Sequence, residues 1–239
     1  MIDPAQMIFI CGFTRGGTTW LRNCVGTHPD ICEIKKELAL FRNTNTRKEV
    51  IRKMTRHECT SCKYYIEKSP SNARHLPEAL TLLPEAKYLF IVRDPRDAFI
   101  SHKRSTEPWT NGSNSTVQGC LGKLEAYYRG YAAVQDHRRV FLVRYEDLQM
   151  RFSATLAEVF GFLGVPSNAS MIADSYKENS FLARTGRMPG HEVRSAHRRK
   201  GTMGDWRNHL DDAEATWIRQ DEFWQKFMDD FSYVWDGAP

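Results

Sequence analysis

Three short apolar runs stand out along the chain, and each is followed by a polar turn and a helical pattern. The runs are MIFIC at 7–11, KYLFIV at 87–92 and VFLVR at 140–144. Apolar runs of this length without alternation predict strands that are buried in a parallel sheet. We therefore expect an α/β fold, a P-loop-like parallel sheet flanked by helices on both faces. The loops that follow the three strands should share one rim, where such folds bind their ligands.

The remaining pattern predicts further helices and a short strand within a single domain over residues 1–239. Helices are expected over 46–57, 72–83, 116–137, 146–163, 170–179 and 211–233, and the strand over 64–66. Gly164 and Pro166 are typical of a helix end. The stretch from Phe181 to Gly204 is long, basic and irregular, which indicates a binding loop.

Composition narrows the function classes. The chain has 239 residues, of which 41% are hydrophobic and 26% are charged, as in ordinary soluble globular proteins. The net charge of +5 suits an anionic ligand but is too small and too scattered to favour nucleic acid. A strand at Met7 leaves no room for a signal peptide, and no apolar run has transmembrane length. We therefore expect a cytoplasmic protein without a membrane span.

Six cysteines in a chain of this length do not indicate a disulfide scaffold. Cys11 and Cys24 occupy apolar positions, where core thiols are expected. Cys59-x-x-Cys62 could form half a zinc site, a redox pair or a disulfide. No second cysteine or histidine pair lies nearby, so we interpret these two cysteines as structural or incidental.

The first apolar run leads into a glycine-rich turn and then into the start of a helix. The spacing Gly12-x-x-x-x-Gly17 fits a phosphate-binding loop, in which backbone N–H groups surround an anion at a helix N-terminus. A nucleoside-triphosphate P-loop continues with lysine, but here Thr18 and Thr19 follow, and the basic residue is Arg15. We expect the loop to hold a phosphate-like group beside a guanidinium. The alternative is a glycine-rich turn without a ligand.

This segment resembles the 5′-phosphosulfate loop of sulfotransferases that use 3′-phosphoadenosine 5′-phosphosulfate (PAPS). The matching residues are Arg15, Gly16, Gly17, Thr18, Thr19 and Trp20. The resemblance implies that they bind the nucleotide co-substrate and that Trp20 stacks on its adenine. Packing in the helix core is the alternative for Trp20. Tyr176 lies where a second aromatic contact to adenine is expected.

Two later segments resemble the parts of these enzymes that bind the 3′-phosphate. One has an arginine at a strand end and a serine eight residues later, and the other matches the R-K-G-x-x-G-D-W signature of the cytosolic branch. The matching residues are Arg93, Ser101, Arg199, Lys200 and Gly201. A guanidinium binds phosphate oxygens in pairs, and glycine lets the backbone approach closely. The alternatives are a surface ion pair between Arg93 and Asp97 and a solvated basic loop.

The resemblance leaves two candidates for the base that removes the acceptor's proton. Cytosolic sulfotransferases use a histidine, and the setting of His75 looks similar. The stretch from His28 to Phe41 looks more like glycan and tyrosyl-protein sulfotransferases, whose base is a glutamate in this region. Glu67-Lys68-Ser69-Pro70 also resembles the E-K-[ST]-P of the glycan branch, whose lysine lies at the reaction centre. We assign the base to Glu37 and an assisting cation to Lys68, with His75 as the fallback base.

The resemblance thus implies transfer of the sulfuryl group of PAPS to a hydroxyl or amine, which leaves the product PAP and requires no metal. Arg15 stands where the cytosolic and heparan-type enzymes usually have lysine, whereas the tyrosyl-protein branch has arginine. Because arginine stays protonated, Arg15 can stabilise negative charge on the leaving group but cannot donate a proton to it.

The acceptor is the least constrained part of this interpretation. Variable loops over 44–63 and 106–115 are expected to shape its pocket. The mixed resemblance favours a saccharide or glycoconjugate, followed by tyrosine or a small phenolic or alcohol product. A P-loop kinase would need a lysine in place of Thr18 and a carboxylate for magnesium. The other alternative is a non-catalytic module that binds PAP.

Overall fold

The computed structural model describes residues 1–41, 46–57, 62–106 and 115–235. The chain divides into two compact units. The first consists of Met1–Val92 with Ala126–Ser180, and the second of Arg93–Glu125 with Phe181–Pro239. The single domain over 1–239 stays a prediction.

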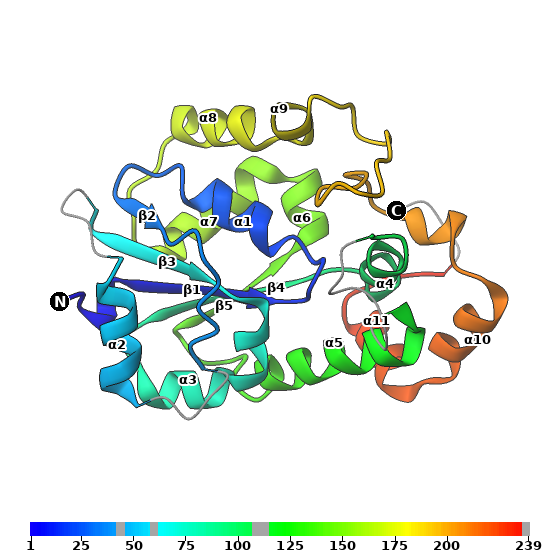
Figure 1. Cartoon of the computed structure of the whole chain (residues 1–239), viewed down its shortest axis with the longest axis horizontal. Helices are drawn as coiled ribbons and strands as arrows, with labels where there is room; N and C mark the ends of the chain where they lie inside the picture. The colour runs from blue at the N-terminus through cyan, green and yellow to red at the C-terminus, as the bar shows by residue number, and fades with distance from the viewer. Residues whose placement is uncertain (42–45, 58–61, 107–114, 236–239) are drawn as a thin grey trace. The chain divides into compact units, whose positions relative to one another are not determined.

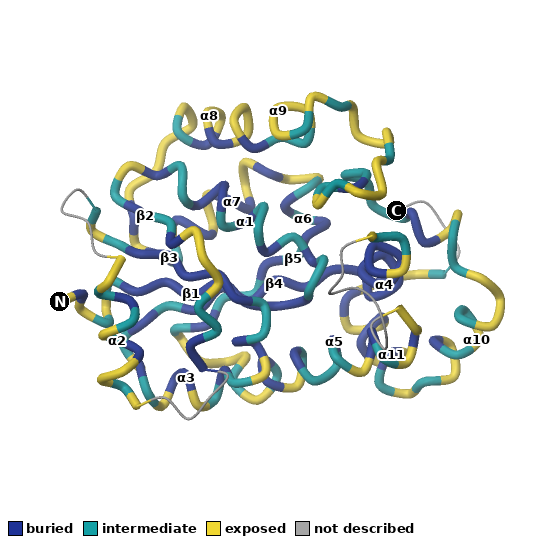
Figure 2. Tube along the Cα trace, in the orientation of Figure 1, coloured by how far each residue is buried: buried dark blue, intermediate teal, exposed yellow. Residues whose placement is uncertain are grey.

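The first unit is built on a five-stranded parallel sheet in the order β2-β3-β1-β4-β5 (Figure 1). The strands are β1 (Met7–Gly12), β2 (Ile31–Glu33), β3 (Tyr64–Lys68), β4 (Lys87–Val92) and β5 (Val140–Arg144). The central strands β1 and β4 are buried almost throughout (Figure 2), as expected for parallel strands that are covered on both faces. The expected α/β fold is therefore confirmed. Gly12 pairs with Ile91 and Val92 with Arg144, so the carboxyl ends of these three strands meet at one edge.

Helices α1, α6, α7 and α8 lie on one face of this sheet, and α2 and α3 lie on the other (Figure 1). Their bounds are α1 Thr18–Val25, α2 Arg47–Thr55, α3 Leu76–Leu82, α6 Tyr145–Met150, α7 Phe152–Leu163 and α8 Ala169–Asn179, with the 3-10 turns η1 Pro4–Gln6 and η2 Pro70–His75. The predicted helix over 146–163 is two helices, because the backbone at Arg151 leaves the helical region (φ −126°, ψ 42°). Its predicted end is confirmed, since Gly164 adopts the left-handed conformation there.

The second unit contains helices and irregular chain. Its elements are α4 Pro95–Lys103, the first part of α5 (Val117–Ala132), α9 Phe181–Thr185, η5 Asp205–Asn208, α10 Asp212–Gln220 and α11 Glu222–Asp230. The predicted helix over 211–233 is split at Asp221, whose side chain accepts a hydrogen bond from the Trp224 N–H and so begins α11. The buried guanidinium of Arg96 lies over the rings of Trp206 and Trp235, at 3.9 and 4.7 Å. No helix within the described ranges combines the length and the apolar content that crossing a bilayer requires.

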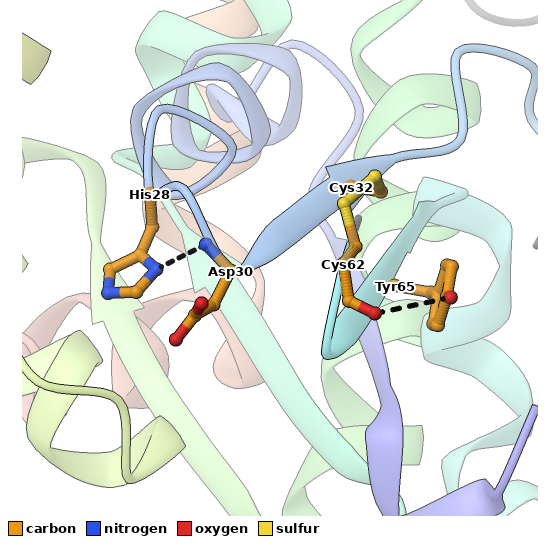
Figure 3. Close-up of a disulfide and its surroundings, with 5 residues drawn as sticks. All are labelled: His28, Asp30, Cys32, Cys62 and Tyr65. Carbon is orange, nitrogen blue, oxygen red and sulfur yellow. Dashed lines mark hydrogen bonds between the residues drawn. A yellow bond between two sulfur atoms is a disulfide. The ribbon is translucent and has the colours of Figure 1, made fainter. Parts of the chain in front are cut away.

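A disulfide between Cys32 and Cys62 joins β2 to the residues that precede β3 (Figure 3). The two Cα atoms are 5.7 Å apart, within the usual range for a disulfide. Cys62 therefore pairs with a cysteine 30 residues away, so of the two expectations for it, structural or incidental, the structural one is confirmed. Cys59 lies outside the described residues. The adjoining turn is held by His28, which accepts a hydrogen bond from the Asp30 N–H at its Nδ1 (3.1 Å) and donates from Nε2 to the Pro166 carbonyl (2.8 Å).

Candidate active site

The turn between β1 and α1 has the geometry of an anion-binding loop. Gly12 (φ 133°) lies so close to β4 that a Cβ atom there would be 2.1 Å from the Ile91 carbonyl oxygen. Arg15 (φ 61°) and Gly17 (φ 93°) also adopt positive φ, and α1 then begins at Thr18. The first turn of a helix carries N–H groups without intrahelical partners, together with the positive end of the helix dipole. The loop can therefore present N–H groups, hydroxyls and a guanidinium to one anion.

An aromatic row runs from this loop across α6 and α7 to α8. The Trp20 ring lies 5.7 Å from Tyr145 and 6.1 Å from Phe152, and Phe152 lies 5.0 Å from Tyr176. Trp20 is thus half-buried in the packing that the sequence allowed as its alternative role. Tyr176 is 52% exposed. The structure brings both predicted adenine contacts into one row, with an exposed ring at its end that an aromatic base can stack on.

Glu37 and Lys68 meet in the first unit, although they are 31 residues apart in the sequence. Lys68 is the last residue of β3 and pairs with Ile10 of β1, two residues before the glycine-rich loop. Its Nζ donates to Glu37 Oε1. The Lys68 side chain is 7% exposed and that of Glu37 is 53% exposed. The candidate base is therefore accessible from solvent, while the assisting cation is held in the protein.

Sequence reasoning missed the role of Glu67, which lies beside this pair. Glu67 is completely buried, and it accepts hydrogen bonds from the Leu38 N–H (2.8 Å), the Asn72 amide (2.9 Å) and the Ser69 hydroxyl. Burial raises its pKa to about 7, against the lowering effect of these hydrogen bonds. The signal in the sequence is the placement of Glu67 in E-K-S-P, at which the expected strand over 64–66 stops; the structure extends that strand through Glu67 and Lys68.

His75, the fallback base, is the last residue of η2 and precedes α3. Its side chain is half-buried. Its role as a base stays a prediction.

The second unit brings Arg93 against the segment that contains the R-K-G signature. Arg93 donates from Nη2 to the Thr202 carbonyl (2.9 Å) and pairs with Asp97 at 3.4 Å. Asp97 in turn accepts from the N–H groups of Gly204 (2.7 Å) and Trp206 (3.0 Å). Burial raises the pKa of Asp97. The ion pair foreseen as the alternative for Arg93 is therefore present, and it also fixes the neighbouring backbone.

Arg199 and Lys200 are paired with carboxylates of their own unit. Arg199 donates to Asp205 (2.6 Å) and Glu192 (2.7 Å), and Lys200 donates to Asp205 (2.5 Å). Arg104 also binds Glu192 through two hydrogen bonds of 3.0 Å. With Arg194, which lies 3.9 Å from Glu192, four cations share these two carboxylates, which leaves an excess of positive charge for an anion. Gly201 (φ 70°) is required, because a Cβ atom there would be 2.3 Å from the Phe181 ring.

The carboxylates of this cluster are strongly stabilised in their ionised form. Hydrogen bonds from Arg104 come first among the causes that lower the pKa of Glu192 to about 2. Burial opposes ionisation of Asp205, but hydrogen bonds from Lys200 and Arg199 hold its pKa at about 2.

Ser101 is buried on α4. The phosphate-binding roles of Arg93, Ser101 and the R-K-G segment stay predictions.

Across the described part of the chain, no group of three or more His, Cys, Asp or Glu side chains is arranged to hold a metal ion. That finding leaves the expectation of a metal-free reaction as a prediction.

Comparison with known proteins agrees with this geometry. A family profile described as "Sulfotransferase domain" matches residues 5–232. Sulfotransferase 1C2 of Oryctolagus cuniculus is 24% identical over 254 residues, which cover 94% of this chain and 84% of the relative. The crystal structure of mouse sulfotransferase SULT7A1 complexed with PAP aligns over 96% of this chain and 89% of that one, with a TM-score of 0.68 and 18% identity. Retinol dehydratase in complex with androsterone and PAP aligns over 100% of this chain and 84% of that one, with a TM-score of 0.60 and 15% identity.

Proposed function

The chain belongs to the sulfotransferase family, and from this premise we propose that it transfers the sulfuryl group of PAPS to a hydroxyl or amine of an acceptor. The observation that carries the proposal is the ion pair between Glu37 and Lys68, next to the strand that leads into the glycine-rich loop. A family member that only bound the nucleotide would have no use for an accessible carboxylate paired with a buried cation at this place.

The residues of the first unit suit the co-substrate. Gly12 and Gly17 allow the backbone to turn tightly around a phosphosulfate, and the α1 N-terminus and Arg15 supply positive charge. The aromatic row that ends at Tyr176 suits an adenine. Two of the similar solved structures are complexes with PAP, which supports PAPS as the donor. Arg93, Ser101, Arg199, Lys200 and Gly201 are the candidates for the 3′-phosphate.

The proposed mechanism is an in-line displacement. Glu37 accepts the proton of the acceptor's hydroxyl as the oxygen attacks sulfur. A new O–S bond forms while the bond between sulfur and the bridging phosphate oxygen breaks, and PAP leaves. Lys68 and Arg15 stabilise the negative charge that grows on the bridging oxygen. Arg15 acts as a fixed charge only, because guanidinium does not give up its proton.

We propose a saccharide or glycoconjugate as the acceptor, because the E-K-S-P segment that supplies Lys68 resembles the glycan branch. Tyrosine or a small phenolic or alcohol product is the second choice. Of the two loops expected to shape the acceptor pocket, the one at 106–115 lies almost wholly outside the described residues, whereas most of the one at 44–63 is described and forms the helix α2.

The test is a transfer assay with PAPS labelled in its sulfur. The protein is incubated with desulfated polysaccharide, a tyrosine peptide and a simple phenol, and the label in each acceptor is counted. Label in the polysaccharide supports the proposal, and label only in the peptide or phenol selects the second choice. Binding of PAP in a calorimeter without any transfer would favour a non-catalytic module, and phosphate transfer from ATP with magnesium would favour a kinase.

A cytoplasmic location remains part of the proposal, and the disulfide is the observation that opposes it. Disulfides persist mainly in oxidising compartments and are rare in the cytosol. A test of the location is to block free thiols in cells before lysis and then to analyse the peptides that contain Cys32 and Cys62 by mass spectrometry. The result decides between the cytoplasm and an oxidising compartment. Mostly blocked thiols support the cytoplasm, and a mostly intact bridge indicates an oxidising compartment.

A further inference from the structure

Three buried side chains accept hydrogen bonds from the backbone of the loop that directly follows the candidate base Glu37. The Leu38 N–H donates to Glu67 (2.8 Å), the Ala39 N–H to Ser69 Oγ (2.9 Å), and the Phe41 N–H to Asn72 Oδ1 (3.3 Å). All three side chains are buried, with exposures of 0, 0 and 1%. We call Glu67, Ser69 and Asn72 the amide clamp.

The members of the amide clamp are also bonded to one another through Glu67. Ser69 donates its hydroxyl hydrogen to Glu67 Oε1, and Asn72 donates from Nδ2 to Oε2 at 2.9 Å. Ser69 can therefore accept from Ala39 while it donates to Glu67. Glu67 is the centre of the network, because both of its oxygens receive hydrogen bonds and each other member contacts it.

The loop needs such a clamp because it has no other regular structure. Ile34, the first residue of the loop, is fixed because its N–H donates to the Ile66 carbonyl (2.9 Å). After Ile34 the chain leaves the sheet. Ala39 has φ 45°, a left-handed conformation that costs free energy for a residue with a Cβ atom and persists only when its surroundings enforce it. Without the clamp, the buried Phe41 N–H and the part-buried N–H groups of Leu38 and Ala39 would lose their partners, and Ala39 could relax.

We propose that Glu67 is a positioning residue for sulfuryl transfer, which acts through Ser69, Asn72 and the loop amides to hold Glu37 against Lys68. Glu37 directly precedes Leu38, the residue that Glu67 binds, and Lys68 directly follows Glu67 on β3. The buried carboxylate thus binds the backbone next to Glu37, and its own residue precedes Lys68 on a strand that is fixed by pairing with β1. The inference rests on the proposed function, because it takes Glu37 as the base.

As an ionised carboxylate, Glu67 accepts from all three partners: the Leu38 N–H and the Asn72 amide nitrogen can only donate, and Ser69 donates its hydroxyl hydrogen. The titratable groups that face it are Cys11 of β1, Glu37 of the loop and Lys68 of β3. A proton on Oε2 would face the Asn72 amide donor, so that contact would be lost, whereas a proton on Oε1 would be donated to Ser69 Oγ and reverse that hydrogen bond. Burial places the pKa of Glu67 at about 7, so this loss falls within the working range of an enzyme.

The decisive experiment compares wild type with Glu67→Gln. We expect kcat to fall by about a hundredfold, as for a modest misplacement of a reacting group, while PAP affinity stays within twofold. The decline of wild-type kcat below about pH 7 should disappear from the pH profile of the variant, and hydrogen exchange at Leu38 and Ala39 should quicken. Glu85→Gln, which removes a half-exposed carboxylate paired with Arg47, is the matched control and should change none of these.

A pair of substitutions at Ser69 protects the test against a misfolded Glu67→Gln protein. Ser69→Ala removes the acceptor for Ala39, and Ser69→Thr keeps it. We expect kcat to fall several-fold in the alanine variant and to be restored largely in the threonine variant. Equal kcat in the two, or a Glu67→Gln protein with kcat within twofold of wild type, would overturn the inference. If wild type transfers no sulfuryl group to any acceptor, the proposed function itself fails. If hydrogen exchange at the Leu38 and Ala39 amides is unchanged in the folded variants, only the amide clamp is refuted.

Discussion

The amide clamp of the first unit and the charged cluster of the second (Arg199, Lys200 and Asp205) each contain a buried carboxylate, but the pKa values of the two carboxylates are shifted in opposite directions. Each holds buried carboxylates against irregular backbone. Glu67 is surrounded mainly by neutral hydrogen-bond donors, and burial raises its pKa to about 7. Asp205 receives hydrogen bonds from two cations, and its pKa lies at about 2. The comparison shows that the balance between burial and charged hydrogen-bond donors decides the protonation state: burial prevails at Glu67, and the hydrogen bonds from Lys200 and Arg199 prevail at Asp205.

The largest effect should come from the base that the clamp serves. Glu37→Gln removes the group that takes the acceptor's proton, so we expect kcat to fall by about 10²- to 10⁴-fold with PAP affinity unchanged. Radiolabel transfer and calorimetry with PAP measure the two quantities. If His75→Ala causes this loss and Glu37→Gln does not, the base is His75, and the clamp serves only the fold.

A smaller but substantial effect is expected in the charged cluster. Asp205→Asn leaves Arg199 and Lys200 without the carboxylate that they share, and breaking a buried pair of this kind costs about 3 kcal/mol. For a chain of this length, that loss lowers the melting temperature by roughly 6–12 °C. Differential scanning calorimetry measures the change. Asp230→Asn, which removes an exposed partner of Lys226, is the control and should leave the melting temperature nearly unchanged.

The contributions of the two regions to the stability of the fold should differ most clearly in their dependence on pH. The folded-state pKa of Glu67 is above the ordinary value of 4.5, so the folded protein binds a proton that the unfolded chain releases. The contribution of Glu67 to stability is therefore complete below pH 4.5 and is lost as the pH rises through about 7, by about 3 kcal/mol in all. Glu192 and Asp205 have lowered pKa values, so their contribution is complete above pH 4.5 and is lost only as the pH falls through about 2.

Urea unfolding of wild type and Glu67→Gln at intervals between pH 5 and pH 8 tests this difference. The free energy of unfolding of wild type should decline with pH relative to the variant, because only wild type has the titrating carboxylate. Parallel curves over the whole range would mean that Glu67 does not titrate there, which removes the contrast between the two regions.

The sequence predicted the parts of the fold that depend on local pattern. The strands at 87–92 and 140–144 were predicted to the residue from their apolar runs, although β4 is central and buried almost throughout, whereas β5 is a half-buried edge strand. The end of β3 was missed, since the expected strand stopped at Ile66, before the charged residues Glu67 and Lys68. They can occupy a buried strand only because the loop at 38–41, Asn72 and Glu37 satisfy them, and these contacts are invisible to a local pattern.

In the candidate site, too, local motifs were predicted and long-range contacts were not. The resemblance to sulfotransferases pointed to Arg15, Glu37 and Lys68, and the structure brings Glu37 and Lys68 into contact. The pairing of Cys32 with Cys62 depends on the register of β2 and β3, which no single segment encodes. The break at Asp221 depends on a capping side chain inside a continuous helical pattern. Long-range register and side-chain satisfaction therefore account for most of what the sequence left open.

The Cys32–Cys62 disulfide has a topological consequence for the loop that carries Glu37. It closes residues 32–62 into a covalent ring, and Glu37 lies inside that ring. A protease that cuts once between the two cysteines opens the ring without releasing either piece. Such a nicked protein runs as a single band on a non-reducing gel and as two after reduction, and Glu37 remains tethered to the sheet whichever side of the cut it lies on.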